Sequence, residues 1–83
     1  MTLPHDIQEQ VSKIDQQIID LLEERMSLCQ EALNEDDEAL GSEYVADTVG
    51  EWEAWADEKG WNLHILGKVC RAVIELCKSV KDD

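Results

Sequence analysis

The stretch IQEQVSKIDQQIIDLLEERMSLCQEA, residues 7–32, decides the fold of this chain. Its apolar side chains recur at alternating intervals of four and three residues. The positions are Ile7, Val11, Ile14, Ile18, Leu21, Leu28 and Ala32. This spacing is typical of a helix that buries one stripe of its surface against partner helices. Arg25 interrupts the stripe, because it stands where an apolar residue is due.

A guanidinium set into an apolar stripe loses part of its hydration, which is costly unless an anion meets it. Arg25 therefore indicates one of two arrangements. Either a carboxylate of this chain or of a second copy pairs with it across the helix interface, or the stripe opens onto a ligand pocket there. The residue pattern alone leaves both arrangements open.

The composition predicts a single all-α domain over residues 1–83. Hydrophobic residues make up 43% of the 83 residues, charged residues make up 33%, and there is one proline. No stretch alternates apolar and polar residues for long enough to predict a strand. A domain of this size buries only about 60 to 65% of the surface that its unfolded chain exposes, so its core is marginal unless it oligomerises.

The chain is strongly acidic, with 7 basic residues against 20 acidic ones and a formal net charge of -13. Such a charge repels nucleic acid, anionic membrane surfaces and polyanionic substrates, and it favours a basic protein partner. The aromatic residues are Tyr44, Trp52, Trp55 and Trp61. Because Trp52 and Trp55 do not share one helical line, one of them is a candidate exposed contact for such a partner.

The first of three expected helices runs from about His5 to Leu33, a rod of roughly 40 to 45 Å. A compact globule of this chain length is only about 30 Å across, so the rod outreaches its own domain. A second copy of the chain is the simplest cover for the rest of its stripe. The acidic segment 34–42 (NEDDEALGS) breaks the pattern and is expected to form a loop.

The second helix is expected to begin with Ser42 as its N-cap and to end at Lys59, where Gly60 supplies a left-handed terminus. Asn62 is expected to cap a third helix. The predicted buried face of the third helix comprises Leu66, Cys70, Val73, Cys77 and Val80, widened by Val69 and Ile74.

Metal sites and cofactors are not expected. Cys29, Cys70 and Cys77 are odd in number and lie next to apolar residues, which indicates reduced core residues in a cytosolic protein. Cys70 and Cys77 are about 10 Å apart on one helix face, too far to share a zinc ion, and no close cysteine or histidine pair is expected. The acidic loop lacks the ligand spacing of a calcium loop. The absence of a long apolar run and of a targeting pattern predicts a cytoplasmic protein that does not enter membranes.

Nearly the whole chain, apart from a short gap in the acidic loop, resembles the all-helical chorismate mutase family. The residues that carry the resemblance are Ile14-Asp15, Ile18, Leu21-Leu22, Glu24-Arg25, Gly60-Trp61-Asn62 and the run VCRAVIELCKS from Val69 to Ser79. The resemblance implies an intertwined homodimer whose long helices cross and whose sites are lined by both chains. It also implies rearrangement of chorismate to prephenate without a nucleophile, acid or cofactor, so that catalysis rests on cations and hydrogen-bond donors placed around the substrate.

The family's first-helix contacts carry over only in part. By the resemblance, Arg25 falls on a substrate-binding arginine. Gln8 stands where the family has an arginine that reaches in from the partner chain. Asp36 falls on or near a lysine that contacts the ether oxygen, which reverses the charge at that position.

The later contacts differ as well. The family's aspartate, arginine and glutamate of the second helix fall near Gly41, Tyr44 and Val45. Lys81 falls on the final glutamine or glutamate that meets the ether oxygen, and Cys77 replaces a small polar residue. Loss of one ion contact to a desolvated carboxylate costs about 2 to 5 kcal/mol, so useful mutase activity is expected to be lost.

The prediction is therefore a non-catalytic chorismate mutase-like homodimer that acts as a binding or regulatory module. Its candidate ligand is a small dicarboxylate, and its candidate ligand-binding residues are Arg25, Lys81, Gln8 and Tyr44. Two alternatives stay open. One is a divergent mutase with weak activity that uses Arg25 and Lys81, and the other is an acidic helical module that binds a basic protein.

Overall fold

The chain folds into three α-helices in the computed structural model, which describes residues 4–79. These are α1 (His5–Glu35), α2 (Ser42–Lys59) and α3 (Leu63–Ser79). No strand occurs within residues 4–79, so the prediction of an all-α fold is confirmed. None of the three described helices is both long and apolar enough to cross a membrane.

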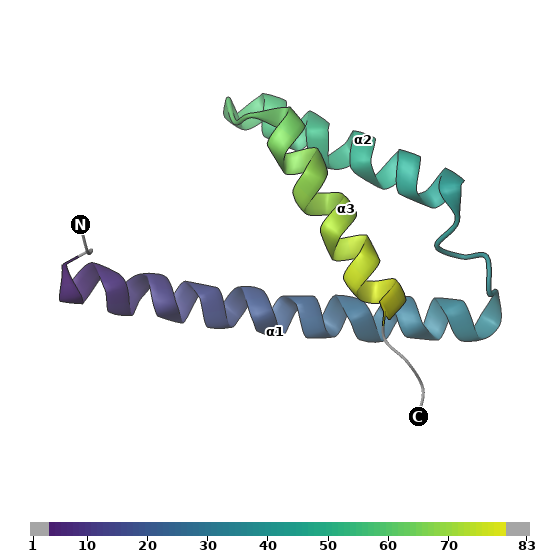
Figure 1. Cartoon of the computed structure of the whole chain (residues 1–83), viewed down its shortest axis with the longest axis horizontal. Coiled ribbons are helices and arrows are strands. Elements are labelled where there is room, and N and C mark those ends of the chain that lie inside the picture. Colours follow the sequence, from purple (N-terminus) through teal and green to yellow (C-terminus); the bar gives the residue numbers. More distant parts are fainter. Residues whose placement is uncertain (1–3, 80–83) are drawn as a thin grey trace.

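α1 is a rod that extends beyond the other two helices at its N-terminal end (Figure 1). Its 31 residues correspond to about 46 Å at 1.5 Å per residue, and the longest dimension of the molecule is 47 Å. The radius of gyration is 15.4 Å, compared with about 12 Å for a compact globule of this chain length. The prediction that the first helix outreaches its own domain is confirmed, and the helix continues to Glu35, into the predicted loop.

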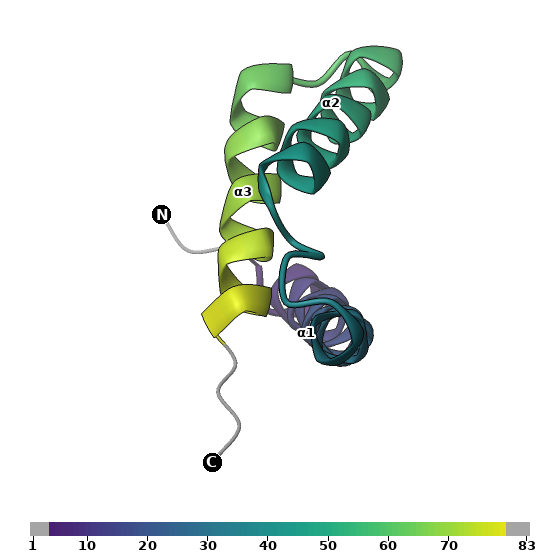
Figure 2. The ribbon, with the colours of Figure 1, turned by 90° about the vertical axis from the view of Figure 1, so that its right-hand side faces the viewer.

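α2 and α3 form a hairpin that stands on the C-terminal half of α1 (Figure 1, Figure 2). α3 packs against both of the other helices. One core cluster lies between α2 and α3 and consists of Val49, Cys70 and Ile74. A second lies where α1, the connecting loop and α3 meet, and it consists of Cys29, Leu40 and Cys77.

The apolar stripe of α1 is partly covered only at Arg25 and Ala32, and the buried residue of the helix, Cys29, lies beside the stripe. Nearer the N-terminus, Ile14 and Ile18 keep 54% and 49% of their surface exposed. The other exposed members of the stripe are Ile7, Val11, Leu21 and Leu28. The periodicity therefore identified the apolar face, but no other described part of the single chain covers most of it.

The ends of α2 follow the predicted signals at one end only. Gly60 ends the helix in the left-handed conformation, with a φ of 73°. The prediction that Ser42 is the N-cap is wrong, because Ser42 is already the first helical residue. The N-cap is Gly41, which makes no side-chain hydrogen bond. The reason lies in the preceding turn, where the Gly41 N–H donates to the Glu38 carbonyl oxygen at 3.0 Å. An added Cβ at Gly41 would lie only 3.0 Å from that oxygen, so the chain places its glycine there.

α3 begins and packs largely as predicted. The Asn62 Oδ1 atom accepts a hydrogen bond from the Ile65 N–H at 3.0 Å, which confirms the cap. The buried residues of the helix are Gly67, Cys70, Val73, Ile74 and Cys77, and Leu66 is half-buried. Val69 is 44% exposed, so its predicted place on the buried face is wrong, because α1 and α2 cover a narrower arc of α3. Val80 lies outside the described residues.

Replacement by alanine is expected to change the free energy of unfolding in opposite directions at Gly50, inside α2, and at Gly60, its C-cap. Gly60→Ala should destabilise the protein by about 1 kcal/mol, because a Cβ disfavours the left-handed backbone. Gly50→Ala should stabilise it by about 0.5 to 1 kcal/mol, because Gly50 is inside the helix and nothing lies within 4 Å of the added Cβ. Urea unfolding of both variants measures this difference, and a shift of the same sign in both would contradict the assigned end of α2.

Candidate functional site

Arg25 projects from α1 toward α2 and α3 and hydrogen-bonds to both. Its Nη2 atom donates to the Tyr44 hydroxyl oxygen at 2.7 Å. Its Nη1 atom lies 3.2 Å from the Cys77 Sγ and 3.5 Å from the Cys29 Sγ. The guanidinium is therefore held in one orientation by side chains from all three helices.

The partners of Arg25 are neutral groups. Within residues 4–79 the structure contains no carboxylate paired with its guanidinium, and the carboxylate partner weighed from the sequence is not found there. Burial lowers the pKa of Arg25, but charge interaction and hydrogen bonding with Tyr44 and Cys77 outweigh it and raise the pKa above its ordinary value. Arg25 is thus a fixed, half-buried cation whose charge these contacts leave unneutralised.

An open hollow of about 340 Å³ lies against Arg25. Its other lining residues are Leu28, Cys29, Ala32, Ala39, Leu40 and Tyr44. Arg25 is the one basic residue in this set, and the remaining walls are mostly apolar. Such a hollow fits one carboxylate on the guanidinium and an apolar body beside it.

A second hollow, of about 300 Å³, adjoins the first and shares Ala39 and Tyr44 with it. Its other lining residues are Asp36, Glu38, Gly41, Glu43 and Asp47. Four carboxylates therefore line a hollow that shares Ala39 and Tyr44 with the Arg25 hollow. They weaken the binding of a ligand that carries a second carboxylate, relative to a monocarboxylate of similar shape, and offer nothing that stabilises that second charge.

The structure brings together only some of the predicted ligand-binding residues. Tyr44 contacts Arg25 directly. Gln8 is exposed near the start of α1, about 25 Å along the helix from Arg25 at 1.5 Å per residue, so one chain does not place both in one site. Lys81 lies outside the described residues.

The family resemblance placed Cys77 at a contact position of the site, whereas sequence reasoning missed Cys29 and the approach of both thiols to Arg25. Cys29 follows Arg25 by four residues, and this spacing predicts that the two side chains are neighbours on α1. Cys77 comes from another helix, so no such spacing predicts its position beside Arg25. Both sulfur atoms lie within 3.5 Å of the Arg25 Nη1 atom, and both cysteines belong to one core cluster. The expectation that no two cysteines lie close together is therefore wrong, because the crossing of α1 and α3 joins residues that are distant in the sequence.

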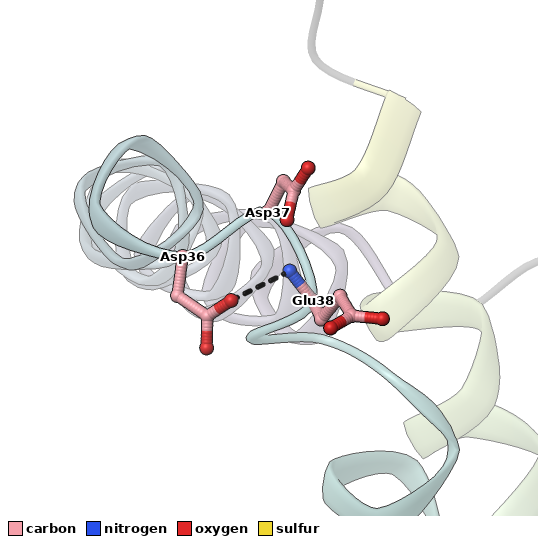
Figure 3. Close-up of side chains that lie close together, drawn as sticks. All are labelled: Asp36, Asp37 and Glu38. Atoms are coloured by element: carbon pink, nitrogen blue, oxygen red, sulfur yellow. Dashed lines mark hydrogen bonds between the residues drawn. The ribbon is translucent and has the colours of Figure 1, made fainter.

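Three exposed carboxylates, Asp36, Asp37 and Glu38, gather in the loop after α1 (Figure 3). Asp36 Oδ1 accepts a hydrogen bond from the Glu38 N–H at 3.0 Å. This bond closes a local turn of the kind that aspartate favours, and it accounts for the position of Asp36. The grouping thus belongs to the turn that leads from α1 towards α2.

Replacing Tyr44 by phenylalanine is expected to lower the free energy of unfolding by about 1 to 2 kcal/mol, because the Arg25 Nη2 donor loses its acceptor in a half-buried setting. Ser79→Ala is a matched control, since the Ser79 hydroxyl also makes a 2.7 Å bond, to the Leu76 carbonyl, but is exposed. The control should change the free energy of unfolding by less than about 0.5 kcal/mol. Equal losses in urea unfolding would contradict the anchoring role of Tyr44.

The family comparison covers almost the whole chain. Residues 7–82 match the family described as chorismate mutase type II. No curated protein and no solved structure shows a significant match. The match includes Arg25 and Tyr44 and all three core-forming helices. The chain therefore belongs to the chorismate mutase type II family.

Proposed function

We propose that this protein is a non-catalytic chorismate mutase-fold homodimer that binds a small carboxylate ligand at Arg25. The observation that carries the proposal is a half-buried guanidinium anchored by neutral groups at the wall of an open hollow. A carboxylate that enters the hollow gains a charge-assisted hydrogen bond to Arg25. Chorismate and prephenate are the first ligands to test, because the chain belongs to this family.

The loss of catalysis is inferred from the charges around the hollow. Rearrangement of a dicarboxylate in this fold depends on several cations, whereas among residues 4–79 Arg25 is the one basic residue that lines its hollow. The adjoining hollow supplies four carboxylates, from Asp36, Glu38, Glu43 and Asp47. The second carboxylate of the substrate and the developing charge on its ether oxygen thus lack the stabilisation that catalysis needs.

The homodimer is supported by the exposed stripe of α1. Ile14 and Ile18 are about half exposed and lie on the same face as Arg25. Burying apolar surface of this kind is worth about 25 cal/mol per Å², so a second α1 laid across it gains stability. By the family resemblance, a partner chain would also bring its own Gln8 toward the site.

Ligand titration tests the binding role. Chorismate and prephenate are each titrated into the protein, and binding is followed by tryptophan fluorescence and by isothermal titration calorimetry. Saturable binding is expected, weakened roughly tenfold to a hundredfold by Arg25→Met because the charge-assisted bond is lost. Lys68→Met removes an exposed positive charge of α3 and should leave the affinity unchanged. Absence of binding to the unmodified protein at millimolar ligand would contradict the proposal.

An acidic protein-binding module is the second candidate, favoured by two exposed tryptophans. Trp52 packs against the α2–α3 core, whereas Trp55 and Trp61 are 49% and 56% exposed. With a net charge of -13, this surface suits a basic protein. Binding that weakens with salt and is lost in Trp55→Ala would support this candidate, whereas salt-insensitive binding would contradict it.

A further inference from the structure

The thiols of Cys29 on α1 and Cys77 on α3 contact the same atom of Arg25. One guanidinium nitrogen, Nη1, contacts both sulfur atoms, at 3.5 and 3.2 Å. Both cysteines are free thiols and belong to the same core cluster. Two free thiols that contact one nitrogen atom from two different helices are a candidate pair for a disulfide, which forms only between cysteines that lie close together.

The two thiols differ in their access to solvent. Cys29 lines the open hollow beside Arg25 and is 9% exposed. Cys77 is fully buried. A small molecule that enters the hollow therefore reaches the sulfur of Cys29 first, and Cys77 lies behind it.

We propose that Cys29 and Cys77 form a reversible disulfide through exchange with a low-molecular-weight disulfide. The Cys29 thiolate attacks one sulfur of the oxidant and expels a thiolate, which leaves a mixed disulfide on Cys29. The Cys77 thiolate then attacks the Cys29 sulfur and expels the second thiolate. The protein loses two protons and two electrons, and the oxidant is reduced to two thiols.

The disulfide ties α3 to α1 at the point where the hairpin stands on the rod (Figure 1). It also joins the two sulfur atoms that contact the Arg25 Nη1 atom, so it alters the contacts that hold the guanidinium in place. The cross-link itself does not depend on the proposed ligand. Only its effect on ligand affinity rests on the proposed function.

Cys70 provides an internal control. It is fully buried in the other core cluster, with Val49 and Ile74. It lies about 10 Å along α3 from Cys77 at 1.5 Å per residue, and it lines neither the Arg25 hollow nor the acidic hollow beside it. Cys70 should therefore stay reduced under conditions that join Cys29 to Cys77.

Peptide mapping tests the proposal directly. The full chain is incubated with oxidised glutathione, remaining thiols are alkylated in denaturant, and the protein is digested with trypsin. Cleavage after lysine and arginine puts Cys29, Cys70 and Cys77 into the separate peptides 26–59, 69–71 and 72–78. The expected products are peptide 26–59 joined to peptide 72–78, and alkylated peptide 69–71. A reducing agent should release the two joined peptides.

Serine variants complete the test. Cys70→Ser should leave the cross-link intact, whereas Cys29→Ser and Cys77→Ser should each abolish it, with circular dichroism to check that each variant remains helical. A non-reducing gel should show the cross-linked wild-type chain at the mass of one chain. Three results would overturn the proposal: a wild-type map without the joined peptides, a disulfide to Cys70, or a disulfide between chains.

The rate of cross-linking is expected to rise with pH, by about tenfold per unit between pH 7 and 9, because the thiolate is the nucleophile. Burial raises the pKa of Cys29, and hydrogen bonding with Cys77 raises it further, which more than offsets the nearby charge of Arg25. The polar groups that face Cys29 are Arg25 on α1, Tyr44 on α2 and Cys77 on α3. Initial rates from quenched peptide maps measure this profile, and a rate independent of pH would contradict attack by Cys29.

Discussion

Replacing Ile14 and Ile18 together by glutamate is expected to weaken the proposed dimer by about a thousandfold. Both side chains are about half exposed in the single chain. Covering each should be worth about 1 kcal/mol, so the four copies in a dimer contribute about 4 kcal/mol. Glutamates in their place would also be buried without partners. Sedimentation velocity over a range of protein concentrations measures the loss.

The control for this change is Ser12→Glu with Gln16→Glu. These substitutions add the same two charges to α1, but positions 12 and 16 lie on the opposite face of the helix from the stripe. The control variant should remain dimeric. A wild-type protein that sediments as a monomer at micromolar concentrations would contradict the proposed dimer, and so would equal weakening by both pairs of substitutions.

Replacing Ile74 by alanine is expected to lower the free energy of unfolding by about 3 kcal/mol. Ile74 is 2% exposed and lies with Val49 and Cys70 in the core between α2 and α3. Removal of its side chain leaves a cavity that neighbouring helices fill only in part. Urea unfolding at one fixed protein concentration measures the change, since the stability of a dimer depends on concentration.

Ile65→Ala is the matched control on the same helix. Ile65 is 57% exposed, so its truncation removes little buried surface and should cost less than about 1 kcal/mol. If both substitutions cost the same, the assigned packing of α3 on α2 would be wrong.

The helices could be predicted from the sequence because local signals specify them. The four-and-three spacing gave α1, and Gly60 and Asn62 marked the end of α2 and the start of α3. The error at Ser42 arose because the capping preference of serine is weaker than the need for glycine where Gly41 approaches the Glu38 carbonyl. Such a close approach depends on the path of the loop, which no residue pattern specifies.

The site could be predicted only in part. Arg25 stood out because it broke an apolar stripe, and the family resemblance pointed to Tyr44. The position of Cys77 beside Arg25 depends on how α3 crosses α1, and that crossing is set by packing and not by local sequence. In the same way, periodicity identified the apolar face of α1, but it does not say what covers that face.

The family fold and the family reaction make different demands on the sequence. The fold requires helices with apolar faces, and the chain keeps these over residues 7–82. The reaction requires several cations around one substrate, and here one anchored arginine adjoins a hollow lined by four carboxylates.

Chorismate turnover tests the central claim most directly. Chorismate is incubated with micromolar protein, and the formation of prephenate is quantified by chromatography against a protein-free control and the Arg25→Met variant. The account predicts the same rate of prephenate formation in all three samples. Faster, saturable conversion by the unmodified protein that is lost in the Arg25→Met variant would contradict it and would identify a working mutase.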